Sequence, residues 1–165
     1  MKIIITGDTH VPQRATHIPQ CLLEAIDDAD LVIHTGDFNS KGAYEIFADR
    51  SKKLYAVRGN RDEGSVEDLL PRNLAFELEG IRTTLLHGHT YGRPRPSRLA
   101  RELGSESDLI IYGHLHRPAI VHFQGCTLIN PGSPTDPRGS DPSYISASVN
   151  NGTIDAKIIC CPASC

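Results

Sequence analysis

Short runs of apolar residues alternate with polar loops along the first part of the chain. The runs cover 2–6, 31–33 and 54–57, are rich in Ile, Leu and Val, and each ends in a polar loop that contains glycine. Runs of this length and composition are typical of strands buried on both faces. The stretches 19–28 and 42–50 carry apolar residues at helical spacing, so the pattern predicts βαβ units and a parallel sheet.

A different pattern begins after Pro71. Apolar residues alternate on both sides of Glu79-Gly80, as in a β-hairpin, and they alternate again in 145–149 and 154–158 on both sides of Asn151-Gly152. The second half therefore predicts paired strands joined by tight turns.

Further elements are predicted between the two hairpins. A helix is expected from Ser97, as its N-cap, to Leu103. The run 109–111 is expected to be a strand, and 119–123 and 126–130 are expected to be antiparallel strands. We find no repeat and no linker, and we expect a single domain over residues 1–165 with a tail at 160–165.

Length, charge and composition narrow the function. The chain has 165 residues, enough for one hydrophobic core, and its formal charge of −3 gives no strong footprint for nucleic acid. No apolar run approaches the length of a membrane span, so we expect a cytoplasmic protein that does not bind a membrane. The five cysteines lack the C-x-x-C spacing of zinc sites, and reduced thiols are expected, although redox chemistry of the C-terminal group stays open.

Residues that can bind metal ions follow the predicted strands one after another. These candidate ligands are Asp8, His10, Asp37, Asn60, His87, His114 and His116. Loops after the carboxyl ends of parallel strands share one edge of a sheet, so we expect the side chains to converge there. Asp and Asn beside glycine are also ordinary turn residues, and only the complete ordered set makes a metal site the better interpretation.

The donor types indicate which metals the site would take. Oxygen and nitrogen ligands without thiolate suit Mn²⁺, Fe²⁺ or Zn²⁺ in a reactive site rather than a structural zinc finger. Seven ligands suffice for two ions if one carboxylate bridges them, and two ions roughly 3.5–4 Å apart serve phosphoester hydrolysis. An extended segment would let His114 and His116 face the same cavity, because residues two apart share a face.

The ordered motifs D-x-H, G-D, G-N, H-G-H and G-H-x-H resemble those of the calcineurin-like metallophosphoesterases. The segment N-P-G-S after them resembles the small phosphodiesterase branch related to the retromer subunit Vps29. This resemblance covers nearly the whole chain and implies a four-layer α-β-β-α sandwich, with two mixed β-sheets flanked by helices. It implies one ion held by Asp8, His10, Asp37 and His116, and a second held by Asp37, Asn60, His87 and His114, with Asp37 as the bridge.

The resemblance implies a dinuclear metal-dependent phosphodiesterase, in which a metal-bound hydroxide attacks a small phosphodiester in line. We expect two divalent ions, manganese before nickel, iron or zinc. A Vps29-like protein-binding scaffold with a vestigial metal site is the alternative, and the complete ligand set favours the enzyme. A homodimer is left open.

One position departs from the family pattern. Many members have histidine directly after the asparagine of G-N, where it resembles a general acid, and this chain has Arg61 there. Arginine binds phosphate but keeps its proton, so leaving groups are expected to depart unaided or with help from His89. A role of His89 in orienting a neighbouring ligand is the equal alternative. The expected catalytic residues are Asp37, Asn60, Arg61 and His89, and the expected substrate-binding residues are Arg61, Arg93 and Arg138. Asp62 is expected to brace its loop.

Overall fold

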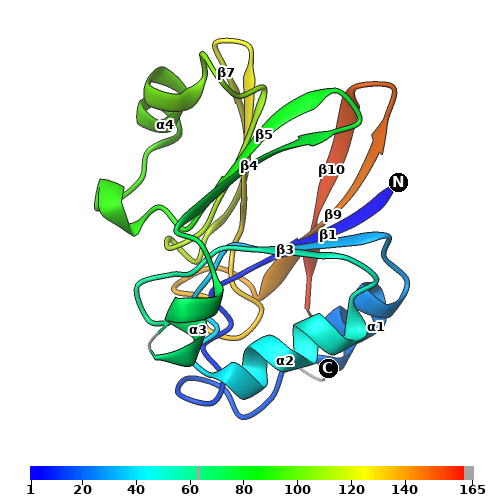
Figure 1. Cartoon of the computed structure of the whole chain (residues 1–165), viewed down its shortest axis with the longest axis vertical. Helices are drawn as coiled ribbons and strands as arrows, with labels where there is room; N and C mark the ends of the chain where they lie inside the picture. Colours follow the sequence, from blue (N-terminus) through cyan, green and yellow to red (C-terminus); the bar gives the residue numbers. More distant parts are fainter. Residues whose placement is uncertain (63, 162–165) are drawn as a thin grey trace.

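The structure is a computed structural model that describes residues 1–62 and 64–161. Two five-stranded β-sheets form the middle of the molecule (Figure 1). The first sheet contains, in spatial order, β10 (Thr153–Cys160), β9 (Ser143–Asn150), β1 (Lys2–Thr6), β2 (Leu31–His34) and β3 (Leu54–Ala56). The second contains β4 (Asn73–Leu78), β5 (Ile81–Leu86), β6 (Leu109–Tyr112), β8 (Cys126–Pro131) and β7 (Pro118–Phe123). Strands β1, β2 and β3 are parallel, as are β5, β6 and β8, and the remaining pairs are antiparallel.

Helices cover the outer face of each sheet. Those on the first sheet are α1 (Gln20–Asp27), α2 (Lys41–Arg50) and the short α3 (Ser65–Leu69), and α4 (Pro96–Leu103) lies on the second (Figure 1). The side chain of Ser40 caps α2 by accepting a hydrogen bond from the amide of Ala43 at 3.1 Å. This arrangement confirms the expected four-layer α-β-β-α sandwich.

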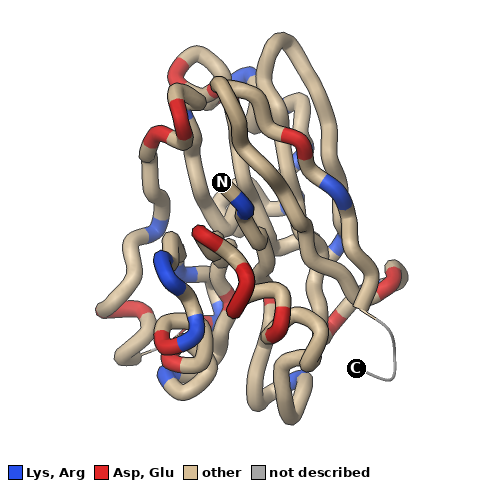
Figure 2. The backbone as a smooth tube through the Cα atoms, turned by 90° about the vertical axis from the view of Figure 1, so that its right-hand side faces the viewer, with Lys and Arg blue, Asp and Glu red and all other residues tan. Residues whose placement is uncertain are grey.

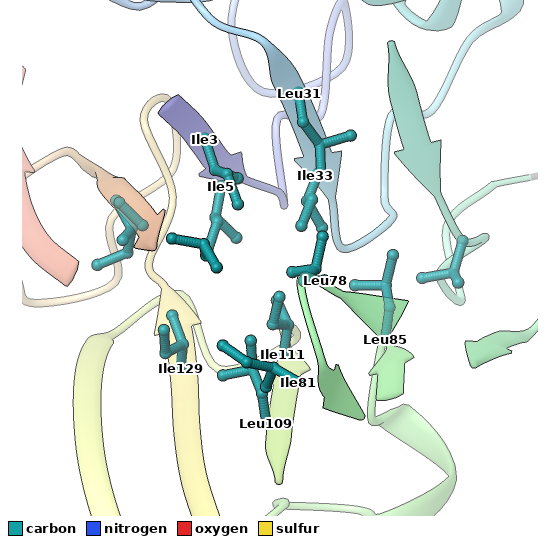
Figure 3. Packing of buried hydrophobic residues seen from close by; sticks show 14 residues of the cluster. Ile3, Ile5, Leu31, Ile33, Leu78, Ile81, Leu85, Leu109, Ile111 and Ile129 are labelled. Atoms are coloured by element: carbon teal, nitrogen blue, oxygen red, sulfur yellow. The ribbon is translucent and has the colours of Figure 1, made fainter. Parts of the chain in front are cut away.

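Side-chain alternation on the strands separates the core into layers. On β1, Ile3 and Ile5 point between the sheets, whereas Ile4 packs under the helices beside Leu22. Figure 3 shows residues of the first sheet facing residues of the second across the central layer. Each isoleucine buried there stabilises the fold by about 1.5–3 kcal/mol, so this layer holds the two sheets together.

Some elements differ from the sequence-based expectation. Arg95, not Ser97, is the N-cap of α4, because Pro96 takes the first helical position, where its missing N–H costs nothing. Strand β8 pairs in parallel with β6, so the strands after residue 118 are not all antiparallel. Helix α3 and the 3₁₀ turn η1 (His89–Tyr91) were not predicted.

The C-terminal residues and the helices bear on two further expectations. A tail was expected from residue 160, whereas Cys160 ends β10 and Cys161 is buried under the helices of the first sheet. The rest of that segment, 162–165, lies outside the described residues. Among the described residues, no helix is both long and apolar enough to cross a membrane.

Candidate metal centre

Loops from both sheets meet at one edge of the sandwich. The loops after β1, β2 and β3 carry four of the candidate ligands, and those after β5 and β6 carry three. From the first sheet come Asp8, His10, Asp37 and Asn60, and from the second come His87, His114 and His116. Five of them are buried, His114 is half-buried and Asn60 is exposed. Parallel strand direction thus gathers the residues of five separate loops.

The backbone at these residues is unusual. Left-handed φ angles, between 48° and 70°, occur at non-glycine residues, namely Asp8, His10, Asp37, His114 and His116. Such conformations cost on the order of 1–3 kcal/mol each and persist where surrounding contacts hold them. The extended segment expected for His114 and His116 is therefore wrong, because β6 ends at Tyr112 and both histidines lie in the tight turn that follows.

Two glycines allow the loops to approach closely. A Cβ atom at Gly59 would lie 2.0 Å from Asp37 Oδ1, and one at Gly113 would lie 2.4 Å from Thr35 Oγ1. Both positions require glycine because real Cβ contacts are longer. This explains the glycines directly before Asn60 and His114 in the sequence motifs.

Hydrogen bonds aim three imidazoles into the same space. In each ring, Nδ1 faces an oxygen: His10 faces Asn39 Oδ1 at 2.8 Å, and His87 faces the carbonyl of Thr35 at 2.8 Å. His116 Nδ1 faces the carbonyl of Asp136 at 2.6 Å. A carbonyl oxygen only accepts, so Nδ1 carries a proton, and each ring, once neutral, presents the lone pair of Nε2 to the cavity.

The ligand atoms form two overlapping groups. Asp8, His10 and His116 make one group, and Asp8, Asp37 and His87 make the other, each with ligand atoms within 4.8 Å of one another. His10 Nε2 and His116 Nε2 are 3.2 Å apart, so two lone pairs face each other unless a cation or a proton lies between them. Asp8 Oδ1 is buried, 3.3 Å from His116 Nε2, and without a hydrogen bond among the described residues.

Asp37 belongs to the second group and also faces the first. Its Oδ1 accepts a hydrogen bond from the amide of Arg61 at 2.7 Å. Its Oδ2 is 3.6 Å from His10 Nε2 and 3.4 Å from His87 Nε2. One carboxylate oxygen thus faces an imidazole of each group, which is the position that a bridging ligand needs.

The remaining two candidate ligands lie on the side of His87. Asn60 Oδ1 is 3.1 Å from His87 Nε2, and the ring of His114 is 5.1 Å from that of His87, centroid to centroid. The amide of His114 donates to Asp8 Oδ2 at 2.9 Å, which joins the loop after β6 to the loop after β1. Asp8 contributes to both groups, whereas the family resemblance implied a place for it with one ion.

Asp62 braces the first-sheet loops as its sequence position indicated. Its carboxylate is buried and accepts hydrogen bonds at 2.8 Å from the amides of Asp37, Asn39 and Gly59. Three donors on one carboxylate hold the loops after β2 and β3 in a common frame.

Charge at the site changes the protonation of the histidines. Burial alone would lower the pKa of His87, but Asp37 and Asp8 outweigh it and raise that pKa to about 9. Burial raises the pKa of Asp37, and His87 with the Arg61 amide overcomes this and brings it to about 2. Asp8 likewise outweighs burial and raises the pKa of His116.

Burial dominates at the other imidazoles. It lowers the pKa of His10 and of His114, and at His89 the neighbouring charge of His87 adds to the same effect. These rings are therefore ready to act as neutral ligands or hydrogen-bonding groups near pH 7.

The residues present fit divalent metal ions. The site gathers two buried carboxylates and three Nε2 atoms that face inward. Asp8 Oδ1 is buried there without a hydrogen bond among the described residues, which is costly, and a bound cation would relieve this cost. Neither group contains a thiolate, and the mixed oxygen and nitrogen donors suit the borderline metals expected from the sequence.

The other expected site residues surround this centre. The ring of His89 lies 5.4 Å from that of His87, and its buried Nδ1 has no hydrogen-bond partner among the described residues. Arg61 is exposed, while Arg93 and Arg138 line a groove that His114 also lines.

Sequence reasoning missed several contributors to the site. Asn39 lies two residues after Asp37, and its amide oxygen is a type of acceptor that often orients a histidine ligand. The Thr35 and Asp136 carbonyls act through the backbone, which leaves no signature in the sequence. Arg117, directly after the H-x-H motif, was not considered and lies in the same groove as Arg93.

The chain is similar in sequence to known metallophosphoesterases. The model for the calcineurin-like phosphoesterase superfamily domain matches residues 1–152. A probable metallophosphoesterase of Methanothermobacter thermautotrophicus is 38% identical over 162 residues, which is 96% of this chain and 92% of the relative. A phosphodiesterase of Methanocaldococcus jannaschii is 27% identical over 150 residues, which is 80% of this chain and 83% of that protein.

A solved structure shares the fold. The crystal structure of wild-type Vps29 from Entamoeba histolytica, complexed with zinc, superposes with a TM-score of 0.80 at 24% identity. The match covers 98% of this chain and 100% of that one.

Proposed function

Because the chain belongs to the calcineurin-like phosphoesterase superfamily, we propose that it is a dinuclear metal-dependent phosphodiesterase. The single observation that carries this proposal is the pair of overlapping ligand groups that share Asp8, with Asp37 Oδ2 facing an imidazole of each group. A relative named as a phosphodiesterase supports a diester as the substrate. Manganese is the metal we propose, in a cytoplasmic protein.

Two ions would be held by residues from both sheets. His10, His116 and Asp8 would hold one, and His87, Asn60 and His114 the other. Asp37 would contact both. When bound, such ions activate water as a nucleophile and neutralise charge on the phosphoryl oxygens.

The protein residues would supply orientation. Thr35, Asn39 and Asp136 fix the tautomers of three imidazoles, and Asp62 holds the loops that carry Asp37 and Asn60. The catalytic geometry thus depends on hydrogen bonds already present in the protein.

Arg61 would bind the phosphate, since its side chain is exposed while its amide is fixed to Asp37 Oδ1. The lowered pKa of His89 keeps that ring neutral near pH 7, which favours orienting the substrate over donating a proton. We therefore expect rates to fall steeply as the leaving group becomes less acidic. Similar rates for p-nitrophenyl and alkyl diesters would contradict this role for Arg61.

Hydrolysis by metal-stripped protein tests the proposed function. Bis-p-nitrophenyl phosphate and p-nitrophenyl phosphate are offered in parallel, with Mn²⁺, Ni²⁺, Fe²⁺ or Zn²⁺ restored singly. We expect turnover only with metal, fastest with Mn²⁺ among the four ions, and faster on the diester than on the monoester. Folded protein that binds two ions and turns over neither ester would instead favour a Vps29-like docking protein.

A further inference from the structure

A groove beside the candidate metal centre is lined by arginines. It has a volume of about 590 Å³, and its lining includes Arg93, Arg95, Arg117, Arg138 and the proposed metal ligand His114. These five residues define the arginine groove. A groove of this size accommodates a small-molecule group, such as one nucleotide unit.

Most arginines of this groove lack a carboxylate partner within the described part of the chain, unlike several other arginines on the surface. Arg50, Arg58, Arg82 and Arg98 each pair with a carboxylate of the protein. Among the described residues, Arg93, Arg95 and Arg117 make no ion pair or side-chain hydrogen bond, and Arg138 shares Asp136 with Arg14. Three of the four groove arginines therefore carry a positive charge that no carboxylate of the described residues neutralises.

Charge on other parts of the molecule is distributed differently. On the side that carries the N-terminus, Figure 2 shows Lys and Arg positions interspersed with Asp and Glu positions. The chain as a whole has a formal charge of −3. An uncompensated group of guanidinium side chains is thus a local feature and not a consequence of a basic composition.

Local structure holds the arginine groove next to the site. Pro94 and Pro96 flank Arg95 and restrict the backbone there, and Pro94 is buried against Gly88 of the H-G-H motif. Arg117 directly follows His116, whose Nδ1 faces the carbonyl of Asp136. Both ends of the groove are therefore attached to loops that carry proposed metal ligands.

We propose that the arginine groove binds a second phosphate group of the substrate. The natural substrate is then a small phosphodiester that carries another phosphate on one of its alcohols, a class that includes phosphorylated nucleotide esters. Guanidinium groups match the geometry of phosphate oxygens, and the ester to be cleaved would lie at the metal ions beside His114. This inference rests on the proposed phosphodiesterase function and names its substrate class.

Two chromogenic esters that differ by one phosphate test the inference. They are thymidine 5′-(p-nitrophenyl phosphate) with and without a 3′-phosphate, offered to the Mn²⁺-loaded protein. We expect kcat/KM to be about tenfold or more higher for the 3′-phosphorylated ester, mainly through a lower KM, and the preference to shrink as salt screens the exposed guanidinium groups. Equal values for the two esters would overturn the inference.

Substitutions in the arginine groove test whether the groove causes the preference for the 3′-phosphorylated ester. The triple substitution Arg93→Gln, Arg95→Gln and Arg117→Gln should bring the ratio of the two kcat/KM values close to one. Arg101→Gln is the matched control, because Arg101 is an exposed arginine of α4 that does not line the groove. A preference that survives in the triple variant would overturn the assignment.

Equilibrium binding separates this inference from the proposed function. Calorimetry compares thymidine 3′,5′-bisphosphate with thymidine 5′-monophosphate, and neither titration depends on turnover. In one outcome the protein cleaves no ester but binds the bisphosphate preferentially, and the triple variant loses this preference. That outcome supports phosphate binding in the arginine groove and contradicts the proposed phosphodiesterase activity. Cleavage of both esters without any preference in rate or binding supports the phosphodiesterase and contradicts the groove.

Discussion

The two sheets contribute differently to the candidate metal centre. Loops of the first sheet supply both carboxylates, Asn60 and one histidine, whereas loops of the second sheet supply histidines alone. Each ligand group contains two residues from the first sheet and one from the second, either His116 or His87. Neither sheet completes a group by itself, so the site is a product of packing the two sheets together.

This division ties metal binding to the central core layer. Residues such as Ile33 and Ile111 set how the sheets face each other, and the ligands lie on loops at the ends of the same strands. Ions that bind only the packed sheets stabilise that packing by mass action. Substitutions in the loops of one sheet, at the ligands, or in the central core layer should therefore change activity, metal affinity and the free energy of unfolding to different extents.

Removing the negative charge of Asp37, which faces both groups, should have the largest effect. Asp37→Asn keeps an oxygen for the Arg61 amide but loses the negative charge that faces His10 and His87. We expect kcat on bis-p-nitrophenyl phosphate to fall about a thousandfold or more, with fewer ions retained. Asp108→Asn, at an exposed ion pair, is the control. An Asp37→Asn protein with near-normal kcat would contradict the bridging role.

Substitutions of two neighbouring isoleucines on β6 distinguish an effect on overall stability from an effect on the packing of the two sheets. Ile110 and Ile111 are both 0% exposed, but Ile111 packs between the sheets and Ile110 packs under α4. Changing either to Ala should lower the free energy of unfolding by about 2–5 kcal/mol, as chemical denaturation would measure. Only Ile111→Ala should also weaken Mn²⁺ binding clearly. Equal losses of affinity would mean that the central layer does not control the site.

Asp62→Asn tests the brace within the first sheet alone. In the wild-type protein, three backbone N–H groups donate to the Asp62 carboxylate. The NH₂ group of an asparagine would face at least one of them, and two donors cannot bond to each other. We expect a loss of about 1–3 kcal/mol in the free energy of unfolding and weaker metal binding. Asp141→Asn, at an exposed position, should change neither. Unaltered unfolding in the Asp62 variant would show that the brace contributes little.

The smallest expected effect is a proton released when metal binds. In the metal-free protein the pKa of His87 lies at about 9, above its ordinary 6.5, so its Nε2 is protonated at pH 7. Metal must displace that proton, and we expect about one proton released from His87 at pH 7 and affinity that rises toward pH 9. Calorimetry in two buffers of different ionisation enthalpy measures the release. Metal binding at pH 7 without proton release would contradict the assignment.

The same pKa sets a pH dependence of stability in the absence of metal. Because the folded-state pKa of His87 exceeds its ordinary value, the charged ring stabilises the metal-free fold below about pH 6.5, and this contribution is lost as the pH rises through about 9.

Much of the architecture followed from the sequence because apolar runs and strand-end residues are local signals. The strands and layers of the described residues confirm the expected sandwich, and the candidate ligands were named from their positions after the strands. The left-handed turns at His114 and His116, the sharing of Asp8 and the carbonyl of Asp136 depend on contacts between distant loops. No residue pattern within one loop encodes them.

Anomalous diffraction from Mn²⁺-loaded crystals tests the central claim most directly, because it locates each ion without relying on turnover. The account predicts two peaks about 3.5–4 Å apart on either side of Asp37 Oδ2, one beside His10 and His116, the other beside His87 and Asn60. A single peak at full loading, or peaks away from the junction of the two sheets, would contradict it.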